Sequence, residues 1–453
     1  MNAIEAIALL GGAALAAFGL RKRVWLVALL SLAAIGTAIW LIAAADVDST
    51  GAVLELTFRL SALARMASLV VLAILALLVL DVWLGEPAYN FFPVALAVGG
   101  SAVAVLTLGT PLAIYGALIV ALLIPVGSFT FQVHRNRSVE AAVRHFAFVA
   151  LGGSLGIASL ALAASLPKDQ PATTFVLLAV ILVVAFALKL AAIPFHTHAA
   201  LLVSEAPAAS LALYFGVLVP TTFIAFAEIL VLSGLLPAIV QVQRVQDLLL
   251  GIGLLSAIGG ALLATGALEL RRLVVYGVIS NLGAALVGIA TLSGPGIVGA
   301  VAIMLVSGAC ATQQLLAAGT LERRAAGGRP SARTAPLAAL AFVVGGAGMI
   351  GIPPLVGFPG RFFVELIAYA FSGGIGTALV VAALLLLIAQ LRAGIALFGD
   401  VGGSPIRIEP RPVAGLVGAL IFAALLLGGV IPDSFLKPIA AFADEFLKAI
   451  NPL

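Results

Sequence analysis

Fourteen apolar runs, most of them about 20 residues long, follow one another along the 453-residue chain, and only short polar segments separate them. A helix of about 20 residues crosses about 30 Å of hydrocarbon while satisfying its own backbone hydrogen bonds. The runs therefore predict an all-α polytopic membrane protein with about fourteen transmembrane helices. The expected limits are 3–20, 24–45, 60–83, 89–108, 111–131, 141–166, 172–192, 208–234, 247–267, 272–292, 296–318, 335–358, 375–399 and 412–431, with an amphipathic tail at 434–449.

Composition excludes several other classes of protein. The chain is 63% hydrophobic and 9% charged, whereas soluble domains are about half apolar and about a quarter charged. Extended disorder, a nucleic-acid-binding module and a secreted disulfide scaffold are excluded on this ground. A single cysteine, Cys310, forms no internal disulfide and holds no structural zinc or iron–sulfur cluster by itself. We therefore expect no cofactor, no metal and no nucleic-acid partner.

Basic residues collect in alternate loops. Fifteen of the 23 lysines and arginines fall in one set of loops and six in the other. Because basic loops stay in the cytoplasm, both termini are expected on the outer face of a cell inner membrane, and the first run is expected to be a retained helix. The richer set is Arg21, Lys22, Arg23, Arg135, Arg137, Arg144, Arg271, Arg272, Arg323, Arg324, Arg329, Arg333, Arg392, Arg407 and Arg411. The poorer set is Arg59, Arg65, Lys168, Arg244, Lys437 and Lys448.

Two of the runs contain, or are directly followed by, proline where a helix cannot continue. Pro194 lies just after the seventh run, and Pro353, Pro354 and Pro359 lie in or just after the twelfth. Such a break survives in a membrane where it lines a polar cavity or is buried in protein, although a plain proline kink is the alternative. A matched pair of breaks is typical of transporters with two inverted repeats. We expect one transmembrane domain, 1–453, made of N-terminal helices 1–108, a first repeat 109–234, a second repeat 247–399, and a C-terminal helix with its tail, 412–453.

Lys189 is expected near mid-membrane, beside the first break. An unpaired charge at that depth costs several kcal/mol, and a low dielectric disfavours the charged form of an amine. A lysine in such a place can take up and release protons, so Lys189 is the leading candidate for a proton relay. The alternative is a lysine whose ammonium group snorkels to the nearer interface.

Three further charged residues are expected at membrane depth. Arg361 keeps its proton in proteins, so it is predicted to be a fixed charge rather than a proton carrier. Glu365, four residues later, is placed to neutralise Arg361 on one helix face. Glu228, in the eighth run, is either a protonatable site or a paired structural carboxylate.

Polar side chains also follow the first break. His196, His198 and Glu205 are predicted to form a proton-uptake group, because histidine titrates near neutral pH. A metal site is the alternative, although His-x-His with one glutamate is a weak metal pattern. Gln313 and Gln314, in the eleventh run, either support a water wire or bond to neighbouring helices.

Four segments resemble a known family. ALKLAAIPFHTH with SEAP (204–207), NRSVEAAVRHF (136–146), LELRRLVVYGVISNLG (268–283) and GIPPLVGFPGRFF (351–363) are similar to segments of the proton-conducting antiporter-like membrane subunits. These are the M/N/L-type subunits of respiratory complex I, with relatives in Mrp-type sodium/proton antiporters, membrane-bound hydrogenases and some inorganic-carbon uptake complexes. The resemblance covers roughly residues 110 to 400. It implies fourteen helices, inverted repeats with helices 7 and 12 broken, and charged residues at mid-membrane that carry protons.

The resemblance carries over to some positions and not to others. Lys189 matches the family's helix-7 lysine, and Arg361 matches its helix-12 lysine or glutamate. The helix-5 glutamate falls near Val120, although this chain has no acid between Glu86 and Glu140. The helix-8 lysine falls at about Pro220 and the helix-11 lysine or histidine near Thr312.

The implied function is that of a proton-translocating membrane subunit in a respiratory (NADH-quinone oxidoreductase-like) or hydrogenase-type complex. Its expected partners are other membrane and peripheral subunits of a redox or transport complex, the lipid bilayer and protons. Two alternatives stay open at this point: a membrane subunit of a cation/proton antiporter or carbon-uptake complex, and a structural subunit that conducts nothing. The chain is not expected to have a catalytic site of its own.

Overall fold

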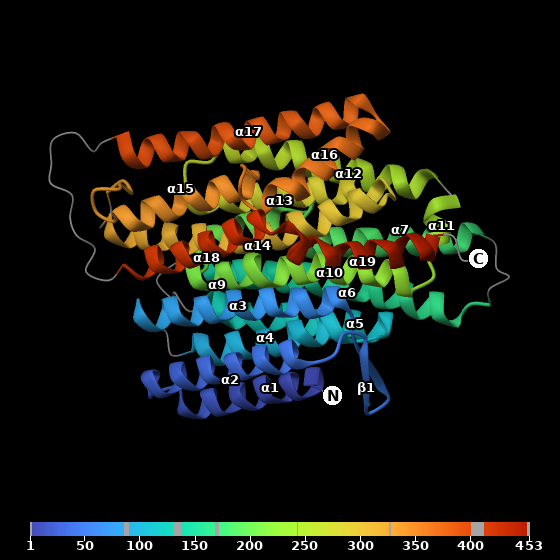
Figure 1. The fold of residues 1–453 in the computed structure, drawn as a ribbon, viewed down its shortest axis with the longest axis horizontal. Coiled ribbons are helices and arrows are strands. Elements are labelled where there is room, and N and C mark those ends of the chain that lie inside the picture. The colour runs from blue at the N-terminus through green and yellow to red at the C-terminus, as the bar shows by residue number, and fades with distance from the viewer. Residues whose placement is uncertain are drawn as a thin grey trace.

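The computed structural model describes residues 2–85, 90–130, 137–167, 172–241, 243–325, 328–399 and 412–450. Four basic residues of the loop pattern, Arg135, Lys168, Arg407 and Arg411, lie outside these ranges. The described chain is a bundle of long helices that run side by side along one direction (Figure 1). The first residues of α1 and the last residues of α19 lie toward the same end of the bundle (Figure 1).

The elements follow the chain in this order. The N-terminal part contains α1 (Asn2–Leu20), α2 (Val24–Ala44), β1 (Ser49–Val53), β2 (Leu56–Leu60), α3 (Ala62–Leu84) and α4 (Phe91–Thr107). The next part contains α5 (Pro111–Leu123), the 3₁₀ helix η1 (Ile124–Thr130), α6 (Ser138–Ser165), α7 (Ala172–Lys189), α8 (Thr197–Glu205), α9 (Ala208–Leu213), the π-helix η2 (Tyr214–Leu218), α10 (Val219–Leu232) and α11 (Leu236–Gln241). The last part contains α12 (Gln243–Gly266), α13 (Leu270–Ala290), α14 (Gly294–Arg324), α15 (Pro336–Ile350), α16 (Gly357–Phe371), α17 (Gly373–Phe398), α18 (Val413–Val430) and α19 (Pro432–Ile450).

This architecture confirms the predicted polytopic helical membrane protein. Within the described ranges, eleven helices are long and apolar enough to cross a membrane, and three shorter apolar helices complete the fourteen predicted runs. Two of these shorter ones, α7 and α15, are short because each stops at a break. The helices that follow the breaks, α8 and α16, and the hairpin formed by β1 and β2 were not predicted. The division into two inverted repeats stays a prediction.

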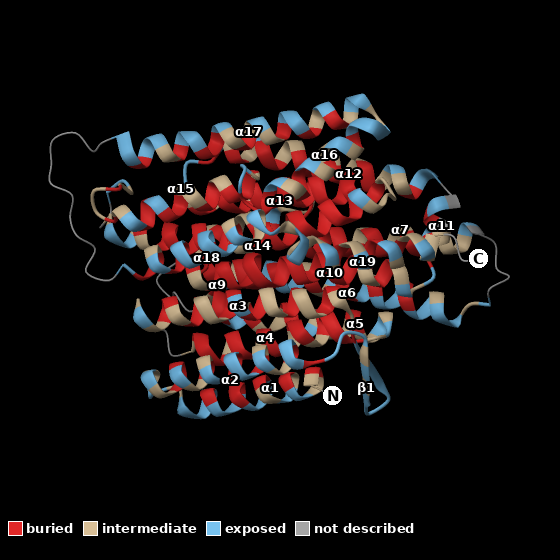
Figure 2. Ribbon diagram, in the orientation of Figure 1, coloured by how far each residue is buried: buried red, intermediate tan, exposed pale blue. Residues whose placement is uncertain are grey.

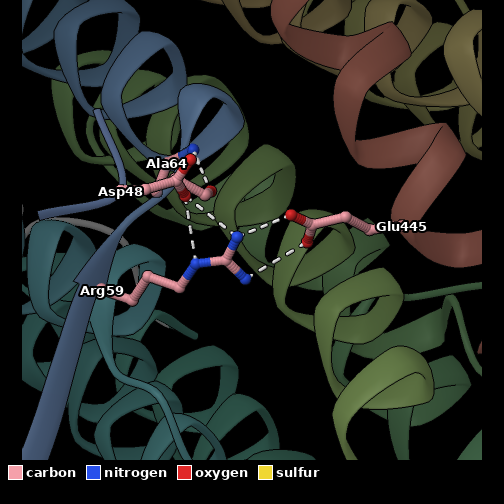
Figure 3. A network of polar contacts seen from close by, with 5 residues as sticks. Asp48, Arg59, Ala64 and Glu445 are labelled. Atoms are coloured by element: carbon pink, nitrogen blue, oxygen red, sulfur yellow. Dashed lines mark hydrogen bonds and ion pairs between the residues drawn. The ribbon is translucent and has the colours of Figure 1, made fainter. Parts of the chain in front are cut away.

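The hairpin and the C-terminal helix meet at one end of the bundle. Strands β1 and β2 pair antiparallel, with Ser49 opposite Leu60. Arg59 of β2 donates to Asp48 at 2.9 Å and to Glu445 of α19 at 2.6 Å (Figure 3). The hydrogen bond to Glu445 raises the pKa of Arg59 above its usual value, although partial burial opposes this. Because all three groups are largely exposed, such contacts contribute at most about 1 kcal/mol each, so they orient α19 more than they stabilise it.

Apolar burial holds α19 in place. Its buried residues are Ile439, Phe442, Ala443 and Phe446, whose spacing places them on one face of a helix. This face packs against α14 and α3. The predicted amphipathic tail is therefore a helix docked on the bundle.

The centre of the bundle is formed by α13 and α14. Inside their apolar segments, 94% of the α13 residues and 83% of the α14 residues are buried, against 33% for α17, which lies at the edge (Figure 2). Helices α12 and α13 approach so closely that a Cβ at Gly283 would lie 2.1 Å from the backbone nitrogen of Ala257. Gly283 is therefore required by helix contact, not by backbone conformation.

Replacing Gly283 by alanine tests this contact. The added methyl group must force α12 and α13 apart, and overpacking of this kind costs about 1–3 kcal/mol. We expect a lower thermal unfolding temperature for the detergent-purified protein. The matched control is Gly251→Ala on α12, where a Cβ meets nothing within 4 Å. Equal melting temperatures for the two variants would contradict the close packing.

Candidate functional site

The first break lies between α7 and α8. Helix α7 ends at Lys189, five residues before Pro194, and the peptide between Ile193 and Pro194 is cis. The hydroxyl of Tyr214 donates to the Lys189 carbonyl at 3.1 Å, and the Ile193 N–H donates to Ser256 Oγ at 3.0 Å. Side chains from η2 and α12 thus satisfy backbone groups that the interrupted helix leaves open. The helix stops and restarts, so the predicted break is confirmed and a plain kink is excluded.

The Lys189 side chain is enclosed by protein. It is 1% exposed, and Nζ has no hydrogen-bond partner. Nζ lies 3.7 Å from the centre of the Tyr115 ring on α5. The alternative that Lys189 snorkels to the interface is therefore wrong. Val120, where the resemblance places the missing acid, is 55% exposed and cannot occupy the same enclosure.

Two buried histidines, from α6 and α8, lie close together at the first break. His145 of α6 and His198 of α8 have ring centres 5.7 Å apart, and the His145 ring lies 4.9 Å from that of Tyr214. Their nitrogens find one partner each: His145 Nε2 lies 3.3 Å from the Leu122 carbonyl, and His198 Nδ1 lies 3.0 Å from the Phe195 carbonyl. The other ring nitrogen of each histidine is buried without a hydrogen-bond partner.

His196 also has a buried ring nitrogen without a hydrogen-bond partner. It is the residue before α8, and its Nδ1 is buried and makes no hydrogen bond. Of the predicted uptake group, His196 and His198 therefore lie at the break together. No group of three His, Cys, Asp or Glu side chains in the described ranges is arranged to hold a metal ion.

Glu205 lies at the end of α8 and lines a large cavity. The cavity has a volume of about 1290 Å³ and also contains Arg271, Arg272, Glu322 and Arg392. Arg271 pairs with Glu322 at 2.5 Å, and Arg272 donates to Ser204 at 2.7 Å. Arginines that the loop pattern assigned to one side of the membrane thus meet in one cavity, next to Glu205.

The second break lies between α15 and α16. Helix α15 ends at Ile350, and Gly351 follows with a φ of 80°, a left-handed conformation that favours glycine. Pro353 and Pro354 lie in the break, joined by a cis peptide. Pro359 does not: it lies in the first turn of α16, where a missing N–H leaves no helical bond unmade. The expectation that Pro359 belongs to the break is therefore wrong.

Arg361 is surrounded by partners. It donates to Glu365 at 2.9 Å and to Asn281 Oδ1 at 3.0 Å, and it is 7% exposed. Asn281 in turn donates to the Met349 carbonyl at 2.9 Å. The predicted Arg361–Glu365 pair is confirmed. An adjoining cavity of about 10 Å³ is close to the space that one water molecule needs.

Glu228 and the pair Gln313 and Gln314 lie apart from the charged side chains of the two breaks. The charges that act on Glu228 of α10 are those of Glu445 and Arg59, so Glu228 belongs to the hairpin end of the bundle. Gln314 donates to the Phe342 carbonyl and to Gln390, each at 3.0 Å, and Gln313 donates to the Ala341 carbonyl at 2.9 Å. These amides cross-link α14 with α15 and α17, as one of the two sequence-based alternatives predicted.

Sequence reasoning missed four residues of these sites: Tyr115, His145, Tyr214 and Asn281. His145 and Asn281 lie inside segments that carry the family resemblance, and a polar residue in an apolar run was a usable signal for both. Tyr115 and Tyr214 gave no such signal, because a tyrosine in a membrane helix is usually a packing residue.

Comparisons with known proteins agree with the fold. A model of the family described as NADH:quinone oxidoreductase/Mrp antiporter, TM, matches residues 141–387. NADH-quinone oxidoreductase subunit 13 of Thermus thermophilus is 32% identical over 214 residues, which span 46% of this chain and 45% of that relative. A chain of respiratory complex I from Thermus thermophilus with bound NADH superposes with a TM-score of 0.80 at 21% identity, covering 100% of both chains. A chain of the Mrp complex from Dietzia gives 0.82 at 16% identity, covering 99% of this chain and 97% of that one.

The network around Arg361 leads to a testable expectation. Asn281→Leu removes the acceptor for Arg361 and leaves the buried Met349 carbonyl unpaired, which costs about 1–3 kcal/mol. Thermal unfolding of the detergent-purified protein should show a clearly lower midpoint. Gln246→Leu is the control, since it removes one amide–carbonyl bond of 2.7 Å at a partly buried site. A loss no larger than that of the control would show that Asn281 does not support the break.

Proposed function

The chain belongs to the NADH:quinone oxidoreductase/Mrp antiporter transmembrane family, and from this premise we propose that it is a proton-translocating, antiporter-like membrane subunit of a multi-subunit respiratory complex. The buried Lys189 amine is the observation that carries the proposal. It has no hydrogen-bond partner and no ion-pair partner among the described residues, so burial works against its charged form and favours release of a bound proton.

Each candidate residue has a role in this proposal. Lys189 takes up and releases the proton, and His196, His198 and Glu205 form the uptake side. The large cavity beside Glu205 admits water to that side. Arg361 and Glu365 are fixed charges, because a guanidinium keeps its proton and its carboxylate partner is 2.9 Å away.

The same proposal covers location and partners. The chain lies in the cell inner membrane with the arginine-rich cavity on the cytoplasmic side and both termini outside. Other membrane subunits pack against its lipid-facing surface, and a peripheral subunit supplies the redox reaction that drives transport. Glu228 joins the relay only if protons also reach the hairpin end, where Arg59 and Glu445 lie.

Two observations favour a different class of function. Lys189 Nζ has no hydrogen-bond partner and no ion-pair partner among the described residues, and the second break holds an arginine where the family has a lysine or glutamate. A structural subunit that conducts nothing would tolerate both features. An antiporter or carbon-uptake assembly would use the same chain with different partners, so neighbouring genes distinguish that alternative.

Substitution of Lys189 tests the proposal. Lys189→Ala removes the titrating group, and Lys189→Arg replaces it with a cation that cannot release its proton. Both variants should lose at least about 90% of proton uptake, a tenfold change that corresponds to about 1.4 kcal/mol. The measurement is quenching of a pH-sensitive dye by inverted membrane vesicles that contain the assembled complex.

The control is Lys437→Arg, an exposed lysine on α19. It should keep its proton uptake, and assembly is checked for every variant by the amount of intact complex. Unchanged uptake in assembled Lys189→Ala complex would leave the structural role as the function.

The histidines behind the break give a second expectation. His145→Phe and His198→Phe keep an aromatic ring in each place but remove the unpartnered nitrogen. If these nitrogens hold water on the uptake side, proton uptake should fall several-fold in both variants. Phe148→Leu is the control, because it removes the ring stacked 4.5 Å from His198 and no nitrogen. Equal uptake in wild type and both histidine variants would exclude the uptake role.

A further inference from the structure

The protonated form of Lys189 needs a stabilising neighbour. An isolated ammonium in the interior of a bundle is strongly disfavoured, and natural sites usually supply a carboxylate. Here the described residues offer Nζ neither a hydrogen bond nor an ion pair. The contact that remains is the Tyr115 ring, whose centre lies 3.7 Å from Nζ.

The Tyr115 ring is held rigidly in this position. Its hydroxyl donates to the Gly152 carbonyl of α6 at 2.5 Å, and its ring is nearly perpendicular to the Phe186 ring of α7, with the ring centres 5.4 Å apart. At Gly156 a Cβ would lie 2.0 Å from the Tyr115 Cζ atom, so only glycine leaves room for the ring. Three helices therefore fix the ring plane under the ammonium group.

The other neighbours of Lys189 do not supply a counter-charge. Gly152 of α6 lies beside its Cγ atom, and the Tyr214 hydroxyl of η2 donates to its backbone carbonyl. Ser256 of α12 bonds to the backbone of Ile193. The other titratable groups that the described residues bring to this break are the histidines His145, His196 and His198, and none of them is an anion.

We propose that Tyr115 is a positioning residue that takes the place of a carboxylate partner: its ring face stabilises the protonated Lys189 and fixes the ammonium over α5. This inference rests on the proposed function, since it assigns how the proton-carrying group is held. The face of an aromatic ring attracts a cation electrostatically, most strongly where both are removed from water.

An aromatic partner changes the electrostatics of the cycle. With a carboxylate partner, release of the proton leaves a buried anion behind. With Tyr115, the site alternates between one positive charge and none, because the ring carries no net charge. The chain therefore needs no acid near Val120 for Lys189 to bind a proton.

The test is the pH dependence of proton uptake in vesicles with the assembled complex. Tyr115→Leu removes the ring, so the protonated form loses its partner and the pH of half-maximal uptake should fall by about one unit. Tyr115→Phe keeps the ring and loses only the hydroxyl, so it should recover the wild-type midpoint. Gly156→Ala should shift the midpoint in the same direction as Tyr115→Leu by displacing the ring.

The outcomes separate this inference from the proposed function. If Lys189→Ala abolishes uptake and Tyr115→Leu keeps the wild-type midpoint, the ring does not stabilise the ammonium and the inference is wrong. A midpoint in Tyr115→Phe as low as in Tyr115→Leu would also overturn it, because the hydroxyl would then be responsible. Uptake that survives Lys189→Ala overturns the proposed function instead. Tyr115→Met, which fills the same space with a flexible chain, replaces Tyr115→Leu if that variant does not assemble.

Discussion

Every backbone polar group inside this bundle must find a partner within the protein, because lipid offers none. The two interrupted helices meet this constraint in the same way. At the first break, Tyr214 and Ser256 reach in from other helices to the backbone of Lys189 and Ile193. At the second break, Asn281 reaches the Met349 carbonyl. Asn281 also accepts a hydrogen bond from Arg361, so at the second break one side chain serves both the backbone and the charged group.

The two breaks differ in their electrostatics. Arg361 has Glu365 and Asn281 as partners, so its charge is permanent and compensated. Lys189 has an aromatic ring and buried histidines nearby but no anion, so its charge is conditional. Under the proposed function, Lys189 would carry the proton at the first break, and Arg361 at the second break would act as a fixed charge.

The glutamine side chains of α14 add to the contrast between the two breaks. Gln313 and Gln314 hold α15, and Gln314 also bonds to Gln390 of α17. Amides do not titrate, so these contacts rigidify the region around the second break without offering it a proton site. Titratable groups are concentrated instead around the first break, where four nitrogens are buried without hydrogen-bond partners: Lys189 Nζ, His145 Nδ1, His196 Nδ1 and His198 Nε2.

The sequence by itself determined the helical membrane fold, the places of both breaks and the charged residues beside them, because hydrophobic run length and proline act locally. Tertiary structure alone decided which side chains from other helices face those charges. Tyr115 is 74 residues from Lys189, and spacing within α5 did not reveal that it, rather than Val120, points into the bundle. Helix rotation and the room left by Gly152 and Gly156 fix that contact, since they depend on how three helices pack and not on any one of them.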